Sequence, residues 1–75
     1  MNDQVIAVIA EVLRVQPEIV APGLSIGDIP EWNSMAQLAI ISTLESRLGI
    51  EIPIDDLFDL TSVQALIDEV EKLKV

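Results

Sequence analysis

Three segments of the chain repeat apolar residues at the spacing of one helix face, and this pattern limits the fold more than any other feature. They span residues 3 to 15, 34 to 48 and 63 to 73, and a stretch rich in proline and glycine, residues 16 to 33, separates the first two. In so short a chain, amphipathic helices can bury their apolar faces only against one another. The pattern predicts an all-α, small four-helix bundle, with three main helices, one short third helix and a long loop between helices one and two. We expect residues 1–75 to form this single domain.

Prolines mark the end of the first helix and the structure of the loop. Pro17 should end the helix near Val15, because the residue before a proline avoids the helical conformation. Residues 17 to 20 have the composition of a single helical turn. Val8 lies off the main apolar stripe, so we expect it to be half exposed.

Capping residues mark the second and last helices. Asn33 should cap the second helix, and Gly49 should end it in the left-handed conformation. The stretch after Gly49, residues 50 to 53, alternates like a strand but has no partner strand, so we predict a loop. Thr61 followed by Gln64 matches a capping box for the last helix.

The short third helix is expected from residues 55 to 60 as one or two turns. Leu57, Phe58 and Leu60 should supply its apolar contacts with the rest of the bundle. Gln37 points toward the core from the second helix, and we expect loop backbone to satisfy its amide.

The composition excludes several kinds of chemistry. The chain has no Cys, His or Tyr, so disulfides, the usual zinc sites and Ser-His or Cys-His catalysis are excluded. The acidic residues around Asp55 lack the spacing of a calcium loop. We therefore expect no catalytic residue and no metal site, and any reactive group must be imported.

The net charge and the hydropathy limit the kinds of partner and the location that we expect. The net charge is −9, which argues against nucleic acid and favours partners with basic patches. No apolar run reaches the roughly 18 residues of a membrane span, and the N-terminus lacks the positive charge of a signal peptide. We expect a cytoplasmic monomer.

Ser34 is the candidate functional residue. As the first residue of a helix, it would hold its hydroxyl near the positive end of the helix dipole, where an attached anion is stabilised. A polar residue at a helix start is common, so this placement alone does not decide whether Ser34 carries a phosphate-containing group.

The order of the elements and three motifs resemble the acyl carrier protein family. The motifs are Asn33-Ser34-Met35, LESRLGIEIP at residues 44–53 and DLFDLTSV at residues 56–63. The resemblance covers residues 5 to 73, nearly the whole chain. It implies that a phosphopantetheinyl transferase attaches 4′-phosphopantetheine from coenzyme A to Ser34. The thiol of this arm would carry acyl or aminoacyl groups as thioesters.

The resemblance also implies a docking surface for the transferase, for an acyl- or aminoacyl-adenylating enzyme and for downstream transferases or synthases. We expect this surface to contain Trp32, Asn33, Met35, Leu38, Ile54, Asp55 and Asp56. Asn33 replaces the usual Asp of the family, and Met35 replaces the commoner Leu. The outer face of the second helix has few acidic residues, so docking should be more apolar than in fatty-acid synthesis.

The sequence predicts a discrete carrier, not an enzyme, that serves a specialised pathway of the polyketide or nonribosomal-peptide kind. An aminoacyl or D-alanyl carrier is the nearest alternative. An acidic helical interaction domain that has lost the arm is an alternative of another class.

Overall fold

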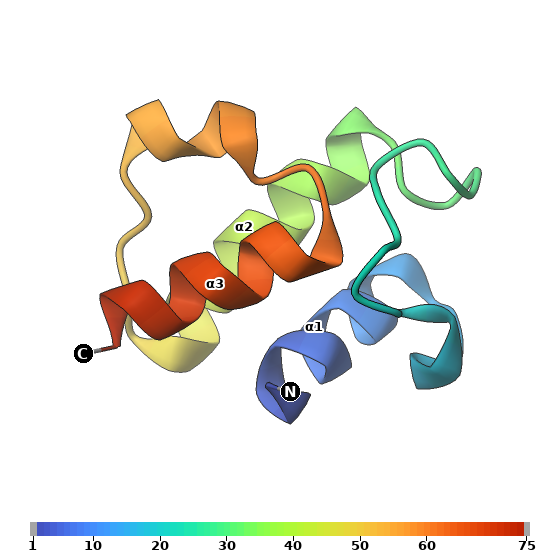
Figure 1. Cartoon of the computed structure of the whole chain (residues 1–75), viewed down its shortest axis with the longest axis horizontal. Coiled ribbons are helices and arrows are strands. Elements are labelled where there is room, and N and C mark those ends of the chain that lie inside the picture. Colours follow the sequence, from blue (N-terminus) through green and yellow to red (C-terminus); the bar gives the residue numbers. More distant parts are fainter. Residues whose placement is uncertain (1, 75) are drawn as a thin grey trace.

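The structure, a computed structural model, describes residues 2–74 as three α-helices and two 3₁₀ helices (Figure 1). In chain order they are α1 (Asp3–Leu13), η1 (Pro17–Ile19), α2 (Ser34–Leu48), η2 (Ile54–Asp59) and α3 (Val63–Leu73). The all-α prediction is confirmed, with η2 as the short helix between α2 and α3. Among these residues, the helices include none that is long and apolar enough to cross a membrane.

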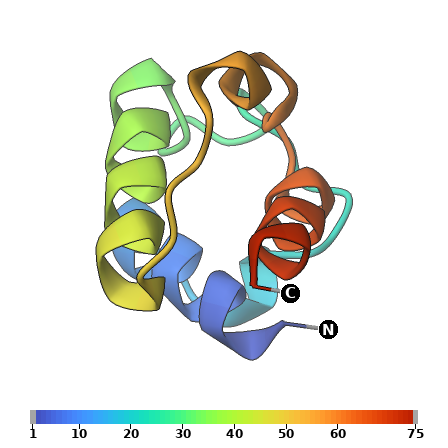
Figure 2. The same cartoon turned by 90° about the vertical axis from the view of Figure 1, so that its left-hand side faces the viewer.

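The helices surround one apolar core. Figure 2 shows α2 and α3 on opposite sides, with α1 below them and η2 above. The fully buried side chains come from all three α-helices and from the loop that precedes α2; the largest are Trp32, Ile9, Ile40, Leu44 and Leu66. The start of α2 and the whole of η2 therefore lie together at one end of the bundle.

The first helix differs from the prediction at two points. Val8 is buried, not half exposed, because α1 packs against both α2 and α3 and so needs a wider apolar face than one stripe. The helix ends at Leu13, two residues earlier than predicted. Arg14 adopts a left-handed conformation with φ of 60°, and the N–H of Val15 reaches back to the Ala10 carbonyl at 3.1 Å. This is a helix end of the kind that glycine usually occupies.

The second helix has the predicted bounds. Its C-cap, Gly49, has φ of 65°, which glycine tolerates because it lacks a Cβ. Residues 50 to 53 form no strand, as predicted. The Ile52 N–H donates to the Glu45 carboxylate at 2.9 Å, so the carboxylate of α2 is used to hold this connection.

The predicted capping box of the last helix is wrong. Ser62 is the N-cap, and its hydroxyl accepts from the Ala65 N–H at 3.1 Å. The cause is an isolated antiparallel bridge between Ser25 and Ser62. The Thr61 carbonyl accepts from the Ile26 N–H at 2.8 Å, which keeps the chain extended at Thr61 and starts the helix one residue later.

Candidate functional site

Ser34 is the first residue of α2 and is exposed to solvent. The Asn33 side chain accepts from the Ala36 N–H at 2.9 Å, and the Asn33 carbonyl accepts from the Gln37 N–H at 2.9 Å. The predicted cap is therefore confirmed. By helix geometry, the N–H groups of Ser34 and Met35 precede the first intrahelical hydrogen bonds and remain available to an external acceptor.

The electrostatics at this helix start suit an anion. The first turn of α2 contains no acidic residue, so no carboxylate competes for the available N–H groups. A phosphodiester on the Ser34 hydroxyl would lie at the positive end of a helix that runs to Leu48. The exposure of Ser34, the free helix start and the absence of an acid in that turn fit an attached phosphate group.

A partly buried pair of side-chain hydrogen bonds fixes the backbone on both sides of Ser34. The indole Nε1 of Trp32 donates to Gln37 Oε1 at 2.7 Å, and Gln37 Nε2 donates to the Leu60 carbonyl at 2.5 Å. Loop backbone was expected to satisfy the Gln37 amide, and the structure shows that the partner is the carbonyl of Leu60, the residue that follows η2. The two hydrogen bonds thus connect the loop before Ser34, the first turn of α2 and the end of η2.

Trp32 does not belong to the docking surface. Its exposed fraction is 0%, so it cannot touch a partner directly, and its place among the predicted docking residues is wrong. Its apolar area favours burial, and Gln37 satisfies its only polar group. The Gly27 N–H donates to the Trp32 carbonyl at 2.9 Å, with Gly27 at φ of 88°, so the preceding loop is folded back onto this residue.

Large exposed apolar side chains occur on the first turns of α2 and on η2. We call them the apolar rim: Met35 (81% exposed), Leu38 (66%), Ile54 (75%) and Phe58 (81%). Phe58 was predicted to supply an apolar contact with the rest of the bundle, which is wrong, because η2 directs Leu57 inward and leaves Phe58 in solvent. Large apolar side chains exposed at both of these elements mark a candidate interaction surface.

The predicted acidic docking residues have different surroundings. Asp55 is exposed, as a docking residue would be. Asp56 is half-buried and forms an ion pair with Lys72 Nζ at 3.3 Å. Asp56 therefore has a contact within the fold that the sequence reading did not anticipate.

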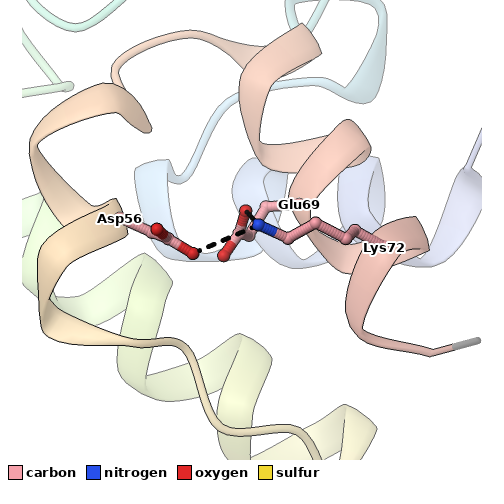
Figure 3. Close-up of polar contacts among 3 residues, drawn as sticks. All are labelled: Asp56, Glu69 and Lys72. Atoms are coloured by element: carbon pink, nitrogen blue, oxygen red, sulfur yellow. Dashed lines mark hydrogen bonds and ion pairs between the residues drawn. The ribbon is translucent and has the colours of Figure 1, made fainter.

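Figure 3 shows that Asp56 of η2 faces Glu69 and Lys72 of α3. Lys72 Nζ also lies 3.1 Å from Glu69 Oε1. Burial, followed by a hydrogen bond with Asp56, raises the pKa of Glu69, whereas hydrogen bonds with Glu69 and then Lys72 lower the pKa of Asp56. The burial of Glu69 was missed, although its position in the apolar pattern of α3, next to Val70, was a signal for it.

A surface depression of about 250 Å³ lies between α1 and α2. Its lining residues are Gln4, Ala7, Val8, Arg47 and Leu48. Because Arg47 and Leu48 are the last residues of α2, this depression is at the opposite end of that helix from Ser34 and is not part of the site.

Comparisons with known proteins agree with this geometry. A family profile described as "Phosphopantetheine attachment site" matches residues 3–70. The chain is 33% identical over 66 residues to an acyl carrier protein of Thermosynechococcus vestitus, covering 88% of this chain and 82% of that protein. It also resembles the solution structure of holo acyl carrier protein from Geobacter metallireducens, with a TM-score of 0.85 and 25% identity over 96% of this chain and 83% of that one.

Proposed function

This chain belongs to the acyl carrier protein family, and we propose that Ser34 is the residue to which its 4′-phosphopantetheine arm is attached. The family consists of carriers with a covalently bound phosphopantetheine, not of catalysts. The observation that carries the proposal is the exposed Ser34 hydroxyl at the capped start of α2, on a turn without acidic residues.

The attachment reaction requires little of the chain itself. The Ser34 oxygen forms a bond to the phosphorus that bears the pantetheine of coenzyme A, and the bond from that phosphorus to the bridging oxygen breaks. Adenosine 3′,5′-bisphosphate leaves, and the hydroxyl proton passes to a base. Because the chain contains no His or Cys, we assign that base to the transferase. Ser34 is an acceptor, and α2 stabilises the phosphodiester that it acquires.

The arm supplies the thiol that the chain lacks, and acyl groups are carried on it as thioesters. Ser34 and the rim residue Met35 are adjacent, and Leu38 follows one turn later. An enzyme that binds the apolar rim would therefore receive the arm directly beside its contact surface. We assign the partner contacts to the rim together with Asn33 and Asp55.

We further propose that the carrier serves a specialised biosynthetic pathway with partners that dock through apolar contacts. The support is the exposed face of α2, whose residues are Ser34, Met35, Leu38, Ala39, Ser42, Ser46 and Arg47. None is acidic, and the carboxylate of Glu45 is occupied by the Ile52 N–H. An aminoacyl or D-alanyl carrier would use the same arm, and the group loaded by the adenylating enzyme distinguishes the two.

Intact mass after incubation with coenzyme A and a broad-specificity phosphopantetheinyl transferase tests the attachment. We expect the wild type and the control Ser42→Ala, at another exposed serine of α2, to gain one phosphopantetheine, and Ser34→Ala to gain none. A gain by Ser34→Ala would show that another residue is the acceptor. Absence of a gain in both the wild type and Asn33→Asp, with both proteins folded, would reject the proposal.

A further inference from the structure

The helix η2 has no fully buried side chain to anchor it to the rest of the fold. Its apolar residues Ile54 and Phe58 point into solvent. Its C-terminal end is tied by the hydrogen bond from Gln37 to the Leu60 carbonyl. Its N-terminal half is tied to α3 by Asp56. Leu57 is partly buried against the core, so the position of η2 depends on this one apolar contact together with the polar contacts near its two ends.

The contact at Asp56 contains two carboxyl groups and one ammonium group. Lys72 Nζ lies 3.3 Å from Asp56 Oδ2 and 3.1 Å from Glu69 Oε1 (Figure 3). Glu69 is only 7% exposed, and its Oε2 has no hydrogen-bond partner within residues 2–74. A buried carboxylate oxygen without a donor is costly.

A proton on the Glu69 carboxyl would give the unpaired oxygen a hydrogen-bond partner. Two carboxylates can only accept hydrogen bonds, whereas a carboxylic acid also has an O–H donor. If Glu69 holds the proton, it can donate to Asp56, and the negative charge of Asp56 is then balanced by Lys72. Burial, and next the hydrogen bond with Asp56, raise the pKa of Glu69 above its ordinary value, which agrees with this assignment.

We propose that Asp56, Glu69 and Lys72 form a protonated latch that holds η2 against α3, and that loss of the proton loosens η2 together with the rim residues Ile54 and Phe58. After deprotonation, Glu69 and Asp56 repel each other, and both compete for one ammonium group. The latch thus makes the presentation of half of the apolar rim dependent on pH.

Other charged groups do not replace this cluster. Asp56 and Lys72 are the charged groups that act on Glu69 in the described part of the chain. On the neighbouring elements, Glu11 of α1 pairs with Arg47, and the carboxylate of Glu45 in α2 accepts from the Ile52 N–H.

On η2 itself, Asp55 and Asp59 are exposed, so neither supplies a buried partner. Asp3 of α1 is also exposed.

The test is NMR of the whole chain between pH 4.5 and 8, in which backbone amide exchange in η2 is compared with that in α1 after correction for intrinsic rates. In the wild type, we expect the protection of η2 relative to α1 to fall at least threefold as the Glu69 carboxyl signal titrates. Glu69→Gln keeps an N–H donor and an acceptor without a charge, so its η2 protection should stay high across the range. Asp55→Asn, the neighbouring exposed acid, should behave like the wild type.

Two results would overturn the latch. One is a Glu69 carboxyl signal that titrates at or below the ordinary value of 4.5. The other is equal η2 protection at both ends of the pH range in the wild type, with unchanged protection in Glu69→Gln. Amide protection in α1 and α2 reports whether each variant is folded, so a folding defect is distinguished from a loosened η2. The measurement does not involve Ser34 and is independent of the arm.

Discussion

The indole N–H of Trp32 donates to the side-chain oxygen of Gln37 across Ser34, which lies between them in the sequence, and the two heavy atoms are 2.7 Å apart. The backbone before Ser34 and the first turn after it are thereby joined by a partly buried contact. Ser34 itself is exposed, but its neighbours on both sides are fixed. An arm attached at Ser34, as we propose, would therefore have a fixed base, and the fold would set its orientation toward a modifying enzyme.

Replacing Gln37 should destabilise the protein. In Gln37→Leu, the Trp32 N–H and the Leu60 carbonyl both lose their partner, at a cost of about 1–3 kcal/mol for each buried group left unpaired. Urea unfolding measures the loss, and the emission of Trp32, the single tryptophan, follows it. The control is Gln64→Leu, because Gln64 is exposed and bonds Asp68 at the surface. Equal stability of the two variants would contradict the role of Gln37.

Leu38 and Leu44 lie on the same helix, but truncation to alanine should cost little stability at Leu38 and much at Leu44. Leu38 is 66% exposed, so Leu38→Ala should change the free energy of unfolding by less than about 0.5 kcal/mol. Leu44 is 0% exposed, and Leu44→Ala should cost about 2–5 kcal/mol. Binding to a cognate enzyme should weaken in Leu38→Ala. A large drop in Tm for Leu38→Ala would show that this side chain supports the core.

Two substitutions separate the capping effect of Asn33 from the effect of its missing negative charge. Asn33→Ala removes the acceptor for the Ala36 N–H and should cost about 1 kcal/mol. Asn33→Asp keeps the acceptor and adds a negative charge at the positive end of α2, so its stability should equal or exceed that of the wild type. Urea unfolding of both variants, with the rate of phosphopantetheine addition for Asn33→Asp, makes the comparison. An Asn33→Ala variant as stable as the wild type would contradict the cap.

Arg14→Gly should stabilise the protein. Arg14 has φ of 60°, and a left-handed conformation costs a residue with a Cβ about 1–2 kcal/mol. Glycine relieves this cost but loses more entropy on folding, so we expect a net gain of about 0.5–1 kcal/mol. Arg14→Ala, which removes the side chain but keeps the Cβ, is the control and should show no gain. A gain in Arg14→Ala equal to that in Arg14→Gly would attribute the effect to charge.

The stability of the wild type should decrease as pH rises through the pKa of Glu69. Burial, and then Asp56, raise this pKa above the ordinary 4.5, so the folded state holds the proton more tightly than the unfolded state. This contribution is complete below pH 4.5 and is lost above the raised pKa. Asp56 has the opposite sign: its pKa is lowered from 3.8, and its contribution is lost as the pH falls further.

Glu69→Gln removes the first of these two dependences. Its urea midpoint should exceed that of the wild type at pH 7.5, and the difference should shrink toward pH 4.5. Parallel unfolding curves at several pH values measure this. A difference that does not change with pH would show that Glu69 has the same pKa in the folded and unfolded states.

Local signals predicted most of the fold and the position of Ser34 at the start of α2. Asn33, Gly49 and the apolar spacing of α2 depend on neighbours within a few residues, so that helix was predicted with its observed bounds. The errors came from long-range contacts. The cap moved from Thr61 to Ser62 because residue 25 pairs with residue 62, and no pattern near Thr61 reports this pairing.

The errors in the candidate site have the same origin. Trp32 was expected on the docking surface, but it is buried, with its indole N–H bonded to Gln37, which in turn is bound to Leu60. Phe58 and Glu69 have the opposite of the environments that their polarity suggests: Phe58 is exposed and Glu69 is buried. Polarity alone cannot predict which of these side chains is buried, because their burial depends on how η2 packs against α3.

Because η2 buries none of its side chains, natural variation at Ile54, Asp55 and Phe58 is nearly free of folding constraints. If the apolar rim is the docking surface, as we propose, recognition and foldability are encoded by different residues in this segment. Substitutions along η2 would then change which enzymes the carrier binds, while Trp32, Leu44 and Leu66 keep the scaffold unchanged. The same separation would allow the exposed positions of η2 to be exchanged for those of other carriers without unfolding the protein.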